Sequence, residues 1–209
     1  MDVALRNFRR LEEKFLIVEN FIQEHKTNPT TREIVLRWLI GFYNSFKVVK
    51  DKTLHLAITF TDRYMQENNE MRYTLLQLVA LSTLWITNKH FGYIDLKVEN
   101  LVSTHNGGPI LNKAFTIMQT SDFVLDHPKS LDKNNDIAGV PKCHFLGQYI
   151  LKLALLKHNM SPIKLSLQAV AVRCLSTRIL KEVECLSGVW ITILVSHTGY
   201  GIRDFQDVL

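Results

Sequence analysis

The stretch Leu75–Lys89, LLQLVALSTLWITNK, constrains the fold of this chain more than any other feature. Its apolar residues surround a helical axis on nearly every side, and only Gln77, Ser82, Thr83 and Thr87 interrupt them. A helix that is apolar all round lies in the interior of a domain. It is too short and too polar to cross a bilayer, which takes about 20 largely apolar residues. We therefore expect other helices of the same domain to surround it.

Composition sets the outer limits. At 209 residues, 46% hydrophobic and 22% charged, the chain is long enough for one sizeable domain or two small ones. The net charge of +5 is a mild excess of 25 basic over 20 acidic residues, which does not by itself indicate a nucleic-acid partner. Three cysteines without paired spacing, and no N-terminal signal peptide, predict a reducing, intracellular location in the nucleus, the cytoplasm or both.

Amphipathic helices are predicted on both sides of the central stretch. Apolar residues recur at intervals of three and four over 3–24, which predicts an N-terminal helix. The next helix is expected to begin at Thr30 or Thr31 as N-cap, with Glu33 completing a capping box, and to end near Phe46. No strand alternation of any length appears in this half. Further helices are predicted over Thr53–Gln66, 95–102 and 110–125.

The second half begins after a polar run, 129–141, which we interpret as a linker. Helices are predicted over Phe145–Lys157 and Leu165–Leu180, with Ser161 as N-cap of the latter and Pro162 at its first position. Val189–Val195 is ambiguous, because its β-branched residues favour a strand whereas its short length in a helical context favours a buried helix. The periodicities together predict an all-α protein of two helical lobes with a short helical tail.

Several segments carry a resemblance to one family. TREIVLRWL at Thr31–Leu39 is similar to the cyclin-box opening MRxxLxxWL, and LHLA followed by TDRY at 54–64 is similar to LHLAxxxxDRFL. LQLV with Asn88-Lys89 at 76–89 resembles LQLVxxxxxxxASK. The segments 123–128 and 197–200, FVLDHP and HTGY, resemble later motifs of mitotic-type cyclins. In order and spacing, the chain resembles a divergent, B-type-like cyclin.

The resemblance implies a cyclin fold: a five-helix cyclin box followed by a second cyclin-like repeat that is shortened here. The implied organisation is an N-terminal helix at 1–29, the box at 30–128, a linker at 129–141 and the shortened lobe at 142–209. The implied function is that of a non-catalytic regulatory subunit. Such a subunit forms a heterodimer with a cyclin-dependent kinase and shifts the kinase toward its active arrangement.

Individual residues carry over from the resemblance. Arg32 and Asp62 match the family's internal ion pair, although two ordinary surface charges are the alternative. Lys89, with His90 beside it, matches the lysine that reaches the kinase, although a cation at a helix C-terminus is a common stabiliser. The glutamate that usually partners this lysine is replaced by Ala114 when the alignment runs back from Phe123, or by Met118 when it runs forward from Lys89. Neither side chain offers the carboxylate that the lysine would bind, so the resemblance implies that one of the two polar anchors to the kinase is missing here.

The family also docks substrates with Arg-x-Leu motifs in an apolar groove. Gly41 stands where an acidic residue usually receives the arginine, so a charge-assisted hydrogen bond of roughly 1.5–3 kcal/mol would be absent. Trp38 is equally well explained as a core tryptophan. The matching positions are Thr31, Ile34, Val35, Trp38, Gly41 and Gln77.

Other function classes find little support. Eight histidines without H-E-x-x-H, and cysteines without C-x-x-C, predict no metal site, and no phosphate loop or nucleophile motif predicts a cofactor or an enzyme. Nucleic-acid binding, known for cyclin-like repeats in general transcription factors, is less favoured because no zinc ribbon precedes the repeats. Its candidate phosphate contacts are Arg9, Arg10, Lys47, Lys50 and Lys52. A degenerate cyclin that binds a partner without activating it stays open as an alternative.

Overall fold

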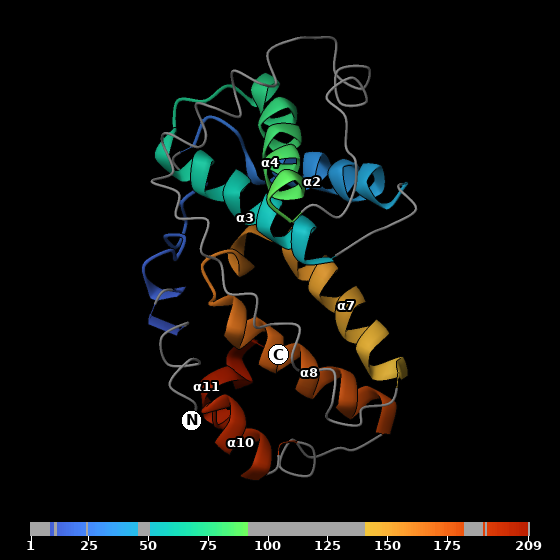
Figure 1. The fold of residues 1–209 in the computed structure, drawn as a ribbon. Helices are drawn as coiled ribbons and strands as arrows, with labels where there is room; N and C mark the ends of the chain where they lie inside the picture. The colour runs from blue at the N-terminus through green and yellow to red at the C-terminus, as the bar shows by residue number, and fades with distance from the viewer. Residues whose placement is uncertain are drawn as a thin grey trace. The chain divides into compact units, whose positions relative to one another are not determined.

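The computed structural model describes residues 9–10, 12–23, 25–45, 51–91, 141–181, 190 and 192–208 (Figure 1). The chain divides into two compact units, which we treat separately. The first unit comprises Ile17–Asp126 together with Leu155–Ser161. The second unit comprises Met1–Leu16, His127–Ala154 and Pro162–Leu209. Every regular element in the described ranges is helical, which confirms the all-α prediction.

The core of the first unit is α4, Leu76–Phe91, as the sequence predicted. Eleven of its 16 residues are buried. The buried hydroxyls among them bond within the helices: Thr83 Oγ1 donates to the Ala80 carbonyl and bonds Thr61 Oγ1 at 2.9 Å, Thr87 Oγ1 donates to the Thr83 carbonyl, and Ser82 Oγ donates to the Leu78 carbonyl. Because these hydroxyls need no water, the helix can be buried on nearly every side.

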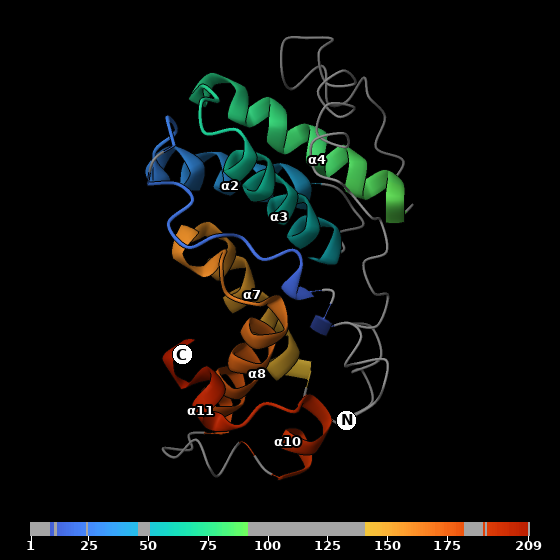
Figure 2. The same ribbon diagram turned by 90° about the vertical axis from the view of Figure 1, so that its left-hand side faces the viewer.

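Two amphipathic helices pack against α4, namely α2 at Pro29–Asn44 and α3 at Asp51–Glu67 (Figures 1 and 2). Leu36, Leu39 and Tyr43 of α2 are fully buried and share one core cluster with Leu81 and Leu84 of α4. A short 3₁₀ turn, η1 at Tyr73–Leu75, leads into α4.

The N-cap of α2 is Asn28, whose Oδ1 accepts a hydrogen bond from the Thr31 N–H at 2.7 Å, with Pro29 at the first position. The prediction of Thr30 or Thr31 as N-cap was therefore wrong by two or three residues.

The N-terminal helix predicted over 3–24 is also wrong for much of its length. Within the described residues, helical structure ends by Glu13, and 16–18 have no regular structure. Asn20 has a positive φ of 61°, which no helix accommodates. Ile17, Phe21 and Ile22 nevertheless lie buried in a cluster with α3 and α4. The apolar spacing thus reflects a non-helical segment packed on the core.

The second unit is built around α8, Leu165–Lys181 (Figure 1). The helix α7, Pro141–Leu156, approaches it closely at Gly147, where an added Cβ would lie 3.6 Å from Val172. On α8 also pack α11 at Ile202–Phe205 and η4 at Gln206–Val208. The core cluster of this unit contains Val170, Ala171, Cys174, Trp190 and Phe205.

Two further sequence predictions can be compared with the structure. The ambiguous stretch Val189–Val195 becomes helical from Thr192, as α10 at Thr192–Thr198, and this helix ends at Gly199 with a left-handed φ of 67°. The helices predicted over 95–102 and 110–125 lie outside the described residues, as does the linker at 129–141 except for Pro141. The predicted domain boundaries stay predictions.

Candidate functional site

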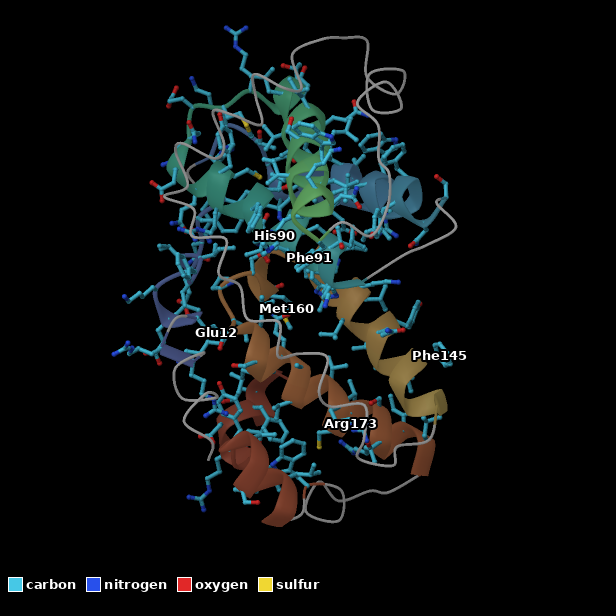
Figure 3. The ribbon with its side chains drawn as sticks, viewed as in Figure 1. Glu12, His90, Phe91, Phe145, Met160 and Arg173 are labelled. Atoms are coloured by element: carbon cyan, nitrogen blue, oxygen red, sulfur yellow. The ribbon has the colours of Figure 1, made fainter. Side chains whose placement is uncertain are left out.

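The C-terminal end of α4 carries the first candidate residues. Lys89 and His90 are exposed in its last turn, directly after Asn88, which is fully buried. Figure 3 labels His90 and Phe91 at this end of the helix. The His90 ring lies 5.0 Å from the ring of Phe91, centroid to centroid, at an angle of 59°. A helix that is buried up to Asn88 fixes the position from which the Lys89 ammonium group projects.

A second ammonium group, from the start of α3, lies at the C-terminal end of α4. Lys52, in the first turn of α3, places its Nζ 5.4 Å from the centroid of the Phe91 ring. This distance is within the range of a cation–π contact. Lys52, Lys89, His90 and Phe91 therefore form one basic and aromatic surface on the first unit, which we call the α4 tip. The other interface candidates, Ala114, Met118 and Phe123, lie outside the described residues.

The expected ion pair between Arg32 of α2 and Asp62 of α3 is present and is bidentate. Arg32 Nε donates to Asp62 Oδ1 and its NH2 donates to Oδ2, both at 2.6 Å. The side chains are 0% and 2% exposed, which excludes the alternative of two surface charges. Since a buried charge is tolerable only when it is paired, each residue requires the other.

The pair also binds a distant segment of the chain. Arg32 NH1 donates to the Leu156 carbonyl at 3.0 Å, and NH2 donates to the Leu155 carbonyl at 3.2 Å. These carbonyls belong to the last turn of α7, where the helix has no partners for them. A cation at this end is also favoured by the helix dipole. We call Arg32, Asp62, Ser161 and these two carbonyls the Arg32 cluster.

Ser161 has a role in this cluster that differs from the predicted one. Its Oγ donates to Asp62 Oδ2 at 2.8 Å and accepts from Arg32 NH2 at 3.1 Å. It follows η3, His158–Met160, and α8 begins only at Leu165, so Ser161 is not the N-cap of that helix. The hydroxyl that a capping motif would use is committed to the Arg32 cluster.

The third candidate set lies mainly on α2. Ile34 is 62% exposed and Thr31, Val35 and Trp38 are half-buried, as is Gln77 of α4. Trp38 packs against the core cluster and stacks on Phe42 with ring centroids 5.7 Å apart. It therefore contributes to the core and still keeps part of its surface accessible.

Gly41 is the open position on the same helix. It is exposed, and a Cβ built there would meet no atom within 4 Å. A longer side chain would fit, so the glycine is not required by packing. The nearest acid on this helix, Glu33, is already paired with Arg37 at 2.8 Å and with Lys157 at 3.3 Å, and these cations lower the pKa of Glu33.

Within the described ranges, no group of three His, Cys, Asp or Glu residues could hold a metal ion. No helix in the same ranges has both the length and the hydropathy to cross a membrane.

Sequence reasoning missed the backbone half of the Arg32 cluster. Carbonyl groups at a helix C-terminus have no sequence signature, and a Ser-Pro dipeptide before a helix is typical of a cap. It also missed Glu12, whose Oε1 accepts from the backbone N–H of Ser166 at 2.8 Å and whose Oε2 accepts from the Ser166 hydroxyl at 2.6 Å. A carboxylate from elsewhere in the chain thus caps α8, and no sequence motif indicates this contact.

Comparison with known proteins identifies relatives along the whole chain. The family model for the cyclin N-terminal domain matches residues 4–125, and that for the cyclin C-terminal domain matches residues 123–209. Similar proteins include a G2/mitotic-specific cyclin-B of Patella vulgata, 25% identical over 209 residues, covering 96% of this chain and 50% of the relative. A G2/mitotic-specific cyclin-B2 of Bos taurus is 25% identical with 96% and 51% covered, and a cyclin-B of Marthasterias glacialis is 26% identical with 92% and 50% covered. The chain spans about half the length of these curated relatives.

Proposed function

The chain belongs to the cyclin family, and on that premise we propose that it is a regulatory subunit of a cyclin-dependent kinase, acting in the cell cycle. Its relatives are G2/mitotic-specific cyclins, which supports a mitotic role. The role is non-catalytic: the subunit binds the active arrangement of the kinase more tightly than the inactive one. Differential affinity alone then shifts the population of the kinase toward activity.

The α4 tip is the observation that carries the proposal. Its exposed Lys89 and His90 follow directly on a buried helix, so the backbone that presents them is already ordered before a partner binds there. The ammonium group of Lys89 can donate to carbonyls or carboxylates of a partner helix. The half-buried Phe91 ring, with Lys52 over one face, adds apolar surface beside it.

Exchanging the charge at this surface tests the proposal. Lys89→Glu should weaken association with a cyclin-dependent kinase by about tenfold or more, roughly 1.4 kcal/mol. The measurement is co-precipitation of purified kinases by the tagged chain, followed by a histone-kinase assay. Circular dichroism should show unchanged helicity, because Lys89 is exposed.

Arg72→Glu is the matched control. Arg72 is exposed, precedes the other end of the same helix and receives the same change of charge, about 24 Å away by helix length. It should bind kinase like the parent chain. An equal loss of kinase binding in both variants would mean that the effect depends on net charge alone. Unchanged kinase binding of Lys89→Glu would refute the role of the α4 tip.

A second candidate function is a cyclin that binds a partner without activating it. The motivating observation is the absence of an acid at Ala114 or Met118, where the family has a glutamate. Ala114→Glu should strengthen kinase association if the alignment from Phe123 is correct. Association without histone phosphorylation would favour this second function over the first.

The outer surface of α2 is the candidate site for substrate docking. Half-buried Trp38 and exposed Ile34 on α2 offer an apolar surface, whereas Gly41 supplies no charge for an arginine. We propose that this surface, if it binds substrates, selects an apolar side chain rather than an arginine-containing motif.

Of the candidate phosphate contacts for nucleic-acid binding, Arg9 and Lys52 already lie over aromatic rings, whereas Arg10 is exposed. The Arg9 guanidinium lies 3.9 Å from the centroid of the Tyr200 ring, and Lys52 lies over Phe91. Lys47 and Lys50 lie outside the described residues. Strongly salt-dependent binding to duplex DNA would reopen this function.

A further inference from the structure

We infer that Ser161 is a modification site for a proline-directed serine/threonine kinase, and that its phosphate releases the segment 155–161 from the Arg32 cluster. The inference concerns the fold of this chain and stands whether or not the chain binds a kinase through the α4 tip. Three observations support it: the local sequence, the accessibility of the loop and the position of the hydroxyl.

The local sequence is unique in the chain. Of the five prolines, only Pro162 follows a serine or threonine, and Lys164 lies two positions further on. The other four prolines follow Asn28, Gly108, His127 and Val140. A kinase that selects a hydroxyl residue followed by proline therefore has one target in this chain.

The loop around Ser161 is accessible. None of the residues 157–164 is buried, and they connect α7 to α8 with no more regular structure than η3, which ends at Met160 (Figure 3). Ser161 lies in the helical region of backbone space, with φ −60° and ψ −38°. A residue before proline prefers the extended region. Once its hydroxyl leaves Asp62, Ser161 therefore favours the extended form that a kinase active site can receive.

The modification is an ordinary phosphoryl transfer from ATP. The catalytic aspartate of the kinase accepts the proton of Ser161 Oγ, and this oxygen bonds to the γ-phosphorus. The bond from that phosphorus to the bridging oxygen breaks, and the electron pair leaves with ADP. The product carries roughly 1.5–2 negative charges at neutral pH.

The Arg32 cluster cannot accommodate this product. Ser161 Oγ now donates to Asp62 Oδ2 at 2.8 Å, and a phosphate at neutral pH replaces that donor with acceptors. One guanidinium, 0% exposed, already serves both Asp62 oxygens and two carbonyls. Added negative charge beside the buried Asp62 is therefore repelled, and the segment 155–161 leaves.

Phosphopeptide mapping of the full chain tests the site. Incubation with ATP and a purified proline-directed kinase should place phosphate on the tryptic fragment 158–164, HNMSPIK, in which Ser161 is the only hydroxyl residue. Pro162→Ala, which keeps the hydroxyl, should lose this phosphate. Absence of phosphate from the parent fragment, or equal phosphorylation of Pro162→Ala, would overturn the inference.

Stability measurements test the consequence. Phosphorylation should lower the urea midpoint and speed tryptic cleavage after Lys157. Ser161→Glu should reproduce the shift, whereas Ser161→Gln, which has the same size without the charge, should reproduce less of it. In Asp62→Asn, where the repelling carboxylate is gone, phosphorylation should shift the midpoint less. Equal midpoints for phosphorylated and unmodified chain would refute release of the segment.

Discussion

Two polar clusters, one in each unit, use acidic and basic residues in opposite ways. In the Arg32 cluster of the first unit, both charges are buried and every contact reaches across more than 25 positions of sequence. In the second unit, Glu12 and Glu13 bind the start of α8 through Ser166 and Lys164. Glu13 is 56% exposed, so water screens its contact with Lys164. The comparison teaches that burial, rather than the number of ion pairs, decides how much each cluster contributes to stability.

Breaking the buried pair should have the largest effect. Arg32→Met leaves Asp62 unpaired in the interior and should lower the free energy of unfolding by about 3–5 kcal/mol. Urea unfolding followed by circular dichroism measures it. Replacing both residues, Arg32→Met with Asp62→Leu, should lower it less than the sum of the two single changes. Strict additivity would show that the two charges act independently, which would contradict the comparison.

Removing the cap of α8 should have an intermediate effect. Glu12→Ala leaves the N–H of Ser166 without its acceptor and should destabilise the chain by about 1 kcal/mol, as loss of a helix cap does. Thermal unfolding checks this value. Glu13→Gln, beside it in sequence but on the surface, is the control and should leave the melting temperature nearly unchanged. An equal drop in melting temperature in both variants would mean that burial does not distinguish the contributions of Glu12 and Glu13 to stability.

The smallest effect should appear as a pH dependence at a buried histidine. Burial lowers the pKa of His25 from its usual 6.5, opposed by backbone groups of Asn68 and Thr27 and by the charge of Glu70. The unfolded chain therefore takes up this proton first as pH falls below 6.5, so stability should decrease from there down to the lowered pKa and then level off. Urea unfolding on both sides of pH 6.5 measures the slope.

His25→Asn isolates this contribution. His25 Nδ1 accepts from the backbone N–H of Thr27 at 2.8 Å, and an asparagine oxygen can take that place without titrating. The variant should lose the part of the pH dependence that His25 contributes to the free energy of unfolding. An unchanged slope would mean that His25 titrates alike in the folded and unfolded chain.

The sequence allowed prediction of features that depend on periodicity and on contiguous motifs. The helix at α4 was predictable because its apolar residues surround the axis, and the Arg32–Asp62 pair because both residues fall in cyclin-like motifs. The N-terminal helix failed because Ile17, Phe21 and Ile22 have helical spacing but reach the core from a segment interrupted at Asn20. Periodicity reports which residues are buried, and tertiary packing decides the backbone that buries them.

The candidate site was predictable to a lesser degree. Lys89 and His90 are exposed at the helix end where the motif placed them. The contacts of Arg32 with the Leu155 and Leu156 carbonyls, and of Glu12 with α8, were not predictable, because partners 123 to 154 residues apart leave no local pattern. A separation of 99 residues from Asp62 likewise hid the role of Ser161.

The reach of Arg32 has a consequence for how the chain is made. The Leu155 carbonyl follows Arg32 by 123 residues, so at ribosomal rates it is synthesised about 6–25 s after Arg32. During that interval the Leu155 and Leu156 carbonyls are absent, and the interior of the first unit waits for the last turn of α7. Completion of its interior is thus timed by translation of the second half, and a stalled ribosome would leave an unfinished core for chaperones to recognise.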